Sequence, residues 1–300
     1  MPQNPCPFGL QNPGTPEPQD PPLILRPLVW QRIVWFALAA MTLFTLVVLF
    51  FIIGFITSKG AHVITPEFLF GMPERMGKEG GILPTIIATI YISLLAIAIA
   101  TPLGVGSAVY LTEYTRESAI TRVIRFGADA LAGVPSIIFG LFGFILFVIR
   151  LRMGWSLAAG GLTLAFMILP TIIRTSEEAI RAVPYNLREV SYSLGGAKSQ
   201  TITRVVLPNA LPGILTGVIL GMGRSVAETA VVIFTAGSSL LMPRSLFDPA
   251  RTMAVHFYIL AREGLSMERA YGTALMLIVS ILLINVVAYS LMFRLTRKMR

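Results

Sequence analysis

Long apolar runs alternate with short polar segments along most of the chain. Each run is close to the ~20 residues that a helix needs to cross ~30 Å of hydrocarbon at ~1.5 Å per residue. Lipid offers the backbone no hydrogen-bond partner, so runs of this length are predicted to be helices, and they lack the alternating pattern of a membrane barrel. The pattern predicts an all-α membrane protein with about six transmembrane helices, at residues 33–56, 85–111, 128–149, 157–173, 209–236 and 272–293.

Prolines interrupt three of these spans, at Pro102, Pro135 and Pro170. They favour broken or kinked helices that line a cavity over straight helices that face lipid. Before the first span, residues 1–29 carry nine prolines and little apolar material, which predicts a disordered tail. This tail has no basic start, short apolar core and cleavage site, so it is not a signal peptide. We therefore expect a tail at 1–29 and a transmembrane domain at 30–300.

Composition supports a lipid environment and argues against several other classes of protein. The chain is 55% hydrophobic and 13% charged, with a mean hydropathy of +0.75. Its net charge of +9 is spread over many loops, so no nucleic-acid surface is predicted. Neither a disulfide nor a metal site is expected, because Cys6 is the single cysteine and the two histidines, His62 and His256, have no partner at ligand spacing.

Basic residues are divided unevenly between the two sides of the predicted membrane. Fourteen lie in the tail, the 112–126 loop, the 174–207 segment and the C-terminus, and nine lie in the opposite loops. Because lysine and arginine are enriched in cytoplasmic loops, both termini and the 174–207 segment are predicted to be cytoplasmic.

The 174–207 segment is too long and too patterned to be a simple connection. Pro184 suits the first turn of a helix, Gly195-Gly196 would end it, and one face carries apolar residues at Leu187, Val190 and Leu194. A short amphipathic helix of this kind can dock into a groove on a cytoplasmic partner. The alternative is an ordinary amphipathic connector.

The spacing in this segment resembles a family signature. Glu189, Gly195 six positions later and Leu207-Pro208 beyond it resemble the EAA loop of bacterial ABC importer permeases, although Val190 and Ser191 stand where alanines are usual. The resemblance implies a type I importer permease bundle whose coupling helices bind an ATPase subunit. It assigns this coupling role to Leu187, Glu189, Val190, Leu194, Gly195, Gly196 and Ala197.

Two ionisable residues, Arg224 and Glu228, lie near the middle of the fifth span. An arginine at the bilayer centre costs at least ~3 kcal/mol on insertion scales, so its presence needs a reason. If the helix is continuous, Glu228 lies one turn further on the same face and can pair with the guanidinium. The same helix carries a stripe of small residues at intervals of four, which would let a helix of a partner permease approach, at Gly213, Gly217, Gly221, Ser225 and Thr229.

The chemistry of this pair suits a tetrahedral oxyanion. The planar guanidinium donates two parallel hydrogen bonds, and a carboxylate can accept a hydrogen bond from protonated phosphate, which sulfate cannot offer. Arg224, Ser225, Glu228 and Thr229 are therefore candidate substrate-binding residues. The alternative is an ion pair that only holds helices together. The glycines of the 133–143 run could likewise present backbone N–H groups to an anion, or only permit tight packing.

Three stretches resemble phosphate-specific transport permeases, and the third of them resembles the A-type subunit of that family. They are residues 221–232, with Ala227 replacing the usual glycine, the run from Gly133 to Gly143, and the segment from Thr252 to Leu265. The resemblance implies a bacterial inner-membrane phosphate importer with a C-type second permease, a dimer of ATP-binding subunits and an extracytoplasmic phosphate-binding protein. No cofactor is expected on this chain, which lacks a phosphate-binding loop ending in Gly-Lys-Ser or Gly-Lys-Thr, so ATP would be hydrolysed by the partner subunits.

Two alternatives to a phosphate importer subunit stay open. The first keeps the importer and changes its substrate to molybdate, tungstate or sulfate. The second is a membrane scaffold or signalling subunit, in which Arg224 and Glu228 are purely structural.

Overall fold

The computed structural model describes residues 27–116 and 118–298, which divide between two units, Met1–Gly54 and Phe55–Arg300. The disordered tail predicted at 1–29 lies mostly outside the described residues, and helix α1 (Pro27–Gly60) already begins at Pro27. Every residue from Trp30 to Ile52 is exposed in this chain alone. A helix that is apolar on all sides, with a mean hydropathy of 2.8, is suited to contact with lipid.

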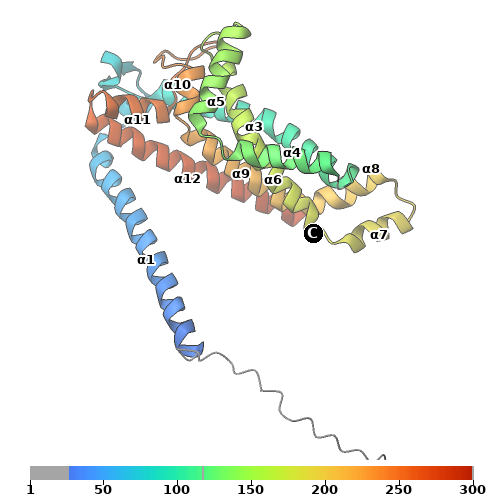
Figure 1. Ribbon diagram of the computed structural model, residues 1–300. Coiled ribbons are helices and arrows are strands. Elements are labelled where there is room, and N and C mark those ends of the chain that lie inside the picture. Colours follow the sequence, from blue (N-terminus) through green and yellow to red (C-terminus); the bar gives the residue numbers. More distant parts are fainter. Residues whose placement is uncertain (1–26, 117, 299–300) are drawn as a thin grey trace, which may run out of the picture. The chain divides into compact units, whose positions relative to one another are not determined.

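The second unit is a helical bundle of long and short helices, drawn in Figure 1. Its helices are α3 (Leu83–Val109), α4 (Ala119–Ala132), α5 (Ser136–Gly143), α6 (Leu157–Arg181), α9 (Leu207–Ala227), α10 (Ala230–Thr235) and α12 (Met267–Lys298). π-helical turns extend α3 through Tyr110–Tyr114 and α5 through Phe144–Arg150. Five described helices are long and apolar enough to cross a membrane, and α4 with α5 gives a sixth if this bent pair is one span. The all-α membrane fold is confirmed.

The core of the bundle lies where α3 packs along α6. Small buried residues let the two backbones approach: a Cβ on Gly104 of α3 would lie 2.7 Å from Cγ2 of Ile172 on α6. Around this contact the core buries Ile92, Leu164 and Ile168 almost completely. Burying side chains of this size stabilises the fold by about 1.5–3 kcal/mol each, so α3 and α6 form the rigid centre of the bundle.

The third predicted span, 128–149, is wrong as a single straight helix. α4 begins at Ala119, within the predicted 112–126 loop, and the chain bends by 100° between α4 and the helix that runs from Ser136 to Arg150. The bend lies at residues 133–135, because Pro135 lacks an N–H and disfavours the helical conformation of the residue before it. The break expected at Pro135 is therefore confirmed, whereas Pro102 and Pro170 lie inside continuous helices.

The fifth predicted span, 209–236, also differs from the structure. A continuous helical segment begins at Lys198 and runs through a π-helical turn at Ile202–Val206 into α9, which ends at Ala227. Its stripe of small residues packs against α6 of the same chain: a Cβ on Gly217 would lie 1.8 Å from Oγ1 of Thr175. The inference that this stripe meets a partner permease is wrong for Gly213 and Gly217.

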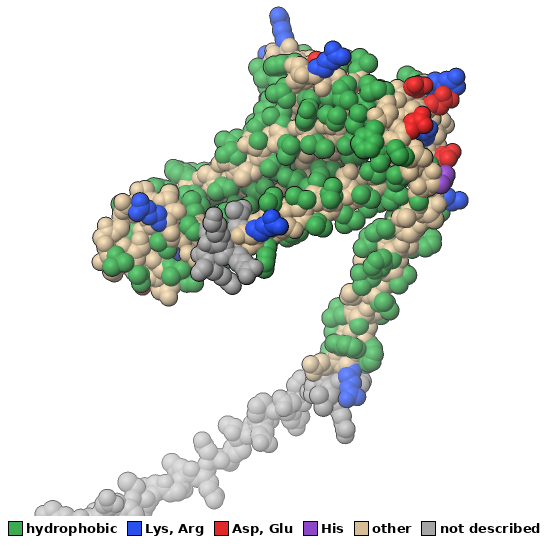
Figure 2. Space-filling model, turned by 180° about the vertical axis from the view of Figure 1, so that it is seen from behind, with side chains coloured by type: hydrophobic (Ala, Val, Ile, Leu, Met, Phe, Trp, Pro, Cys, Tyr) green, Lys and Arg blue, Asp and Glu red, His purple; other side chains and the backbone are tan. Residues whose placement is uncertain are grey.

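Short elements lie at the two ends of the second unit. One end, here the α11 end, holds α2 (Pro66–Phe70), a hairpin of β1 (Pro73–Glu74) and β2 (Glu79–Gly80), and α11 (Met253–Arg262). The other, here the α7 end, holds α7 (Tyr185–Ser193) and α8 (Lys198–Thr201). On the face drawn in Figure 2, apolar side chains cover the sides of the bundle and acidic ones gather at the α11 end.

Candidate functional site

Glu228 lies at a break between two helices rather than within one. Its φ of −72° and ψ of 130° end α9, and α10 begins two residues later, at Ala230. The prediction that Glu228 follows Arg224 by one turn of a continuous helix is therefore wrong. The sequence gives no local signal for this break, because no glycine or proline lies between Gly223 and Gly237. Tertiary packing accounts for it: α10 lies along α5, where a Cβ on Gly140 would come within 3.0 Å of the Ala230 carbonyl oxygen.

Three polar side chains lie close together where the break at residues 133–135 faces the break at Glu228. Arg224 lies half-buried in the last turn of α9, with Glu228 half-buried just beyond it. The Glu228 carboxyl lies against the Ser136 side chain, at the start of α5, and within electrostatic reach of the Arg224 guanidinium. Among the residues that the structure describes, this guanidinium forms no hydrogen bond or ion pair. Its hydrogen-bond donors are therefore available to another group.

The other two candidate substrate-binding residues take different positions. Ser225 is only 2% exposed, and its hydroxyl donates to the Met222 carbonyl at 2.9 Å, so its side chain is occupied within α9. Thr229 is half-buried, and its carbonyl accepts from the Ile233 N–H at 3.0 Å. The structure adds Ser136 to the site residues predicted from the sequence. Its signal is the adjacent Pro135, which breaks the helix and turns Ser136 toward Glu228.

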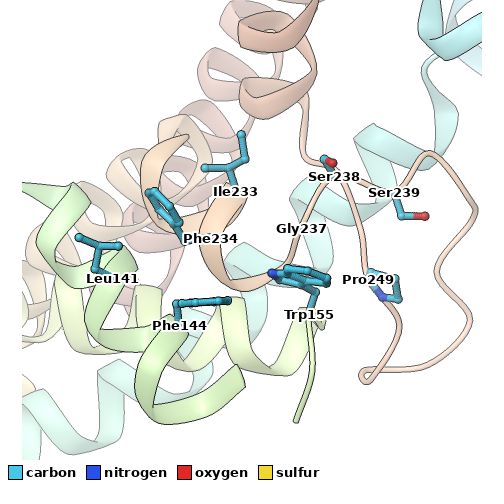
Figure 3. Close-up of a pocket in the computed structure, with 9 residues that line it drawn as sticks. All are labelled: Leu141, Phe144, Trp155, Ile233, Phe234, Gly237, Ser238, Ser239 and Pro249. Carbon is cyan, nitrogen blue, oxygen red and sulfur yellow. The ribbon is translucent and has the colours of Figure 1, made fainter. Parts of the chain in front are cut away.

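A cavity of about 510 Å³ lies beyond this site toward the α11 end. Figure 3 shows its mainly apolar lining, which comes from α5 and its π-helical extension, the segment between that extension and α6, α10, and the loop that follows α10. The lining residues are Leu141, Phe144, Trp155, Ile233, Phe234, Gly237, Ser238, Ser239 and Pro249. Behind it, the buried Arg251 Nε donates to the Ser238 carbonyl at 2.9 Å. This arginine fixes the loop wall of the cavity.

The predicted coupling residues form a second candidate site at the α7 end. α7 ends as the sequence predicts: Gly195 has a φ of +80°, and Gly196 N–H donates to the Ser191 carbonyl at 3.0 Å. This double-glycine stop is a Schellman motif, which only a glycine at the left-handed position forms without strain.

The surface of α7 exposes apolar residues. The exposed fraction is 84% at Leu194 and 58% at Val190, and Leu187 is at the limit of exposure at 36%. Glu189 and Ala197 are also exposed, while Gly196 is half-buried. A short helix that presents apolar side chains beyond the bundle is suited to docking against a partner protein.

No metal centre is found among the described residues, in which no three His, Cys, Asp or Glu side chains gather at ligand distance. His256 is instead a buried packing residue, 1% exposed, with Nδ1 3.4 Å from Nη1 of Arg251. Burial and, to a smaller extent, the positive charge of Arg251 lower the pKa of His256 to about 4, so this ring is neutral at neutral pH.

Comparisons with known proteins agree over most of the chain. A family model described as "Binding-protein-dependent transport system inner membrane component" matches residues 100–300. The "Phosphate transport system permease protein PstA 1" of Mycobacterium tuberculosis (strain ATCC 25618 / H37Rv) is 34% identical over 293 residues, or 93% of this chain and 94% of that protein. The "Probable ABC transporter permease protein YqgI" of Bacillus subtilis (strain 168) is 33% identical over 251 residues, or 78% of this chain and 85% of that protein.

A solved structure supports the fold. A bacterial ABC transporter "involved in the import of the acidic polysaccharide alginate" aligns with a TM-score of 0.63, over 89% of this chain and 99% of that chain. At 17% sequence identity this likeness concerns the helical architecture alone.

Proposed function

Because the chain belongs to the family of binding-protein-dependent transport system inner membrane components, we propose that it is a permease subunit of an ATP-driven importer of inorganic phosphate. It is a multi-pass membrane protein and a transport subunit, not an enzyme. The choice of phosphate rests on the relative named a phosphate transport permease, which matches 93% of this chain.

The site around Arg224 supports passage of an oxyanion. The half-buried Arg224 guanidinium, which forms no hydrogen bond with a described residue, can donate two parallel hydrogen bonds to a tetrahedral anion. Glu228 opposes tight retention of a dianion and accepts a hydrogen bond from a protonated phosphate oxygen. Ser136 can donate to either the carboxylate or the anion. Ionisable side chains within the membrane-spanning part of a bundle mark substrate paths, so the Arg224–Glu228 site is a candidate path for the anion.

The partners follow from the same proposal. A second, C-type permease would complete the path, a dimer of ATP-binding subunits would dock on α7, and an extracytoplasmic phosphate-binding protein would deliver the anion at the α11 end. The excess of lysine and arginine on the α7 side supports a cytoplasmic position for that end and for both termini. ATP would be hydrolysed by the partner subunits, and the bilayer would cover the apolar sides of the bundle.

Uptake of radiolabelled phosphate by cells that carry the Arg224→Gln variant tests the proposal. We expect uptake to be lost while the amount of protein in the membrane stays normal, because glutamine cannot supply the charge or the fork of donors. Arg150→Gln is the matched control, since Arg150 is an exposed arginine outside the site. Retained phosphate uptake in Arg224→Gln would reject the site, and wild-type uptake of sulfate or molybdate in place of phosphate would reject the substrate.

A further inference from the structure

One buried guanidinium joins α7 to two transmembrane helices. Arg188 of α7 donates from Nη2 and Nε to the Glu113 carboxylate, at 2.7 Å and 3.2 Å. It also donates to the carbonyls of Val183 at 2.8 Å and Ile180 at 3.1 Å. Glu113 lies in the π-helical turn that ends α3, and Ile180 lies in the last turn of α6. A single side chain therefore bonds α7 to the ends of α3 and α6.

Charge rather than apolar packing holds α7 in place. Arg188 is the one buried residue of α7 in the described structure. The side chains of Arg188 and Glu113 are each 10% exposed, so water screens their attraction weakly. Carbonyls at a helix C-terminus lack partners within the helix and favour a cation, which explains why Arg188 also caps α6. The apolar residues of α7 are left free on the opposite side.

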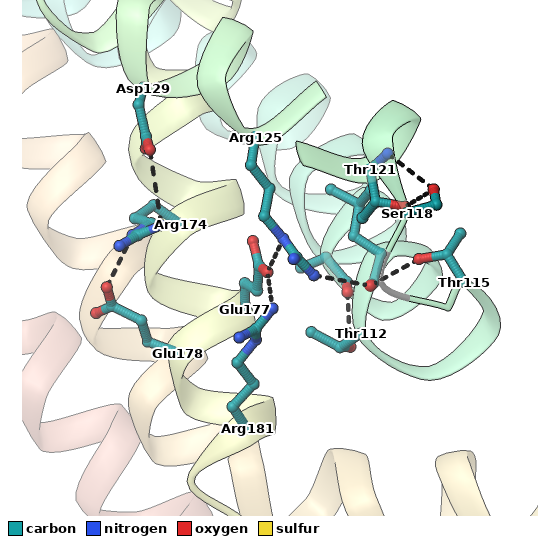
Figure 4. Close-up of polar contacts among 12 residues, drawn as sticks. Thr112, Thr115, Ser118, Thr121, Arg125, Asp129, Arg174, Glu177, Glu178 and Arg181 are labelled. Carbon is teal, nitrogen blue, oxygen red and sulfur yellow. Dashed lines mark hydrogen bonds and ion pairs between the residues drawn. The ribbon is translucent and has the colours of Figure 1, made fainter. Parts of the chain in front are cut away.

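A second charged cluster joins α4 to α6 and to the same end of α3, as Figure 4 shows. Glu177 of α6, with a side chain 5% exposed, lies 2.6 Å from Arg125 Nε of α4 and 2.9 Å from Arg181 Nη2. Arg125 Nη2 also donates to the Leu111 carbonyl at 3.2 Å, two residues before Glu113. α4 leads through the 133–135 break to Ser136, beside Glu228. The end of α3 that holds Glu113 is thus bonded to α4, and α4 is followed across the 133–135 break by α5, which carries Ser136.

We propose that Arg188 and Glu113 form a positioning pair that makes α3 and α6 move with α7 when a partner ATPase displaces it. This inference rests on the proposed docking of an ATPase on α7. Arginine suits the role because its planar fork reaches a carboxylate and two carbonyls at once, whereas lysine is a point charge on a flexible stem. The pair acts through the helices and does not touch the transported anion.

The test uses the complete complex in proteoliposomes, with the variants Arg188→Gln, Arg188→Lys and Glu113→Gln. The readout is phosphate transported per ATP hydrolysed, with co-purification of the ATPase measured in parallel. Each variant should keep the ATPase bound and lower this ratio, by about tenfold for Arg188→Gln, as expected from losing at least one charge-assisted hydrogen bond. The ratio for Arg188→Lys should lie between those of the wild type and Arg188→Gln, because lysine keeps the positive charge.

Glu178→Gln is the matched control. Glu178 also accepts from an arginine, Arg174, at 2.9 Å, but the two side chains are 62% and 53% exposed. An exposed pair contributes little, so the ratio should stay at the wild-type value. A role limited to stabilising the fold would lower the amount of protein, transport and ATP hydrolysis together and leave the ratio unchanged, which would overturn the proposal. If Arg188→Gln fails to accumulate, Arg188→Lys and Glu113→Gln decide the matter by the same ratio.

A second readout tests the positioning role of Arg188 independently of whether phosphate is the transported substrate. Spin labels at Leu103 of α3 and Tyr289 of α12, which are exposed, report the distance between these helices with and without trapped nucleotide. Nucleotide should change that distance in the wild type and not in Arg188→Gln with its ATPase still bound. An equal change in both would overturn the positioning role. Absence of phosphate uptake by the wild type, in contrast, would reject the proposed substrate and leave this distance test intact.

Discussion

Replacing His256 with glutamine should make opening of the β1–β2 hairpin, at the α11 end, less sensitive to acid. His256 is 1% exposed, and the β1–β2 hairpin covers it so closely that a Cβ on Gly77 would lie 2.5 Å from its Cε1 atom. It lies in α11, outside the candidate membrane spans, where burial and Arg251 lower its pKa from 6.5 to about 4. Opening of the hairpin would return the ring to water and to its ordinary pKa.

The sign and size of the effect follow from these two pKa values. Above pH 6.5 the ring is neutral in both states, so its contribution to the stability of the closed state is fully present. As the pH falls below 6.5, His256 binds a proton in the opened state but not in the closed state. The closed state therefore loses stability relative to the opened state until the pH reaches about 4. With ~1.4 kcal/mol for each pKa unit, the loss is about 2 kcal/mol at pH 5 and about 3 kcal/mol below pH 4.

Hydrogen–deuterium exchange of residues 71–82 measures this opening directly. Between pH 7.5 and pH 5, the opening equilibrium of the wild type should rise about thirtyfold more than that of His256→Gln, once intrinsic exchange rates are matched. Glutamine keeps a hydrogen-bonding group at this position and does not titrate. An equal pH dependence in the two proteins, or a loss of protection that begins only near pH 4, would refute the reasoning.

Three further predictions concern packing and docking. Gly217→Val should sharply lower the amount of protein in the membrane, because Thr175 occupies the space that a Cβ needs. Gly223→Ala is the control and should leave the amount unchanged, because a Cβ at Gly223 would have no neighbour within 4 Å. Immunoblots of membranes compare the two variants. Gly195→Ala should destabilise the end of α7 by about 1 kcal/mol, because alanine is strained at a φ of +80°, and should weaken ATPase co-purification modestly. Leu194→Asp should reduce co-purification of the ATPase at least tenfold. The amount of this variant in the membrane should not change, because Leu194 is 84% exposed and contributes little to the fold. Unchanged ATPase binding would exclude α7 as the docking helix.

Features with a local cause were predictable from the sequence. The lengths of the apolar runs gave the helical membrane fold, Pro135 gave the break between α4 and α5, and Gly195-Gly196 gave the end of α7. Each depends on the backbone chemistry of a few neighbouring residues. These features therefore leave a signal that can be recognised without tertiary structure.

Features that depend on distant contacts were not predictable. The break at Glu228 follows from the packing of α10 on α5, and no proline or glycine marks it. The stripe at Gly213 and Gly217 could suit any neighbouring helix, and only the fold identifies that helix as α6. Arg188 and Glu113 are 75 positions apart, so a single sequence gives no reason to pair them.

The role of Arg224 in transport is tested by ATP-driven accumulation of radiolabelled phosphate in proteoliposomes that contain the complete complex, with wild-type and Arg224→Gln subunits compared at equal reconstitution. We expect the wild type to accumulate phosphate in the presence of excess sulfate and Arg224→Gln not to accumulate it, although its ATPase remains bound. Equal accumulation by the two proteins would contradict the proposal that the half-buried arginine at the end of α9 binds the anion on its path across the membrane.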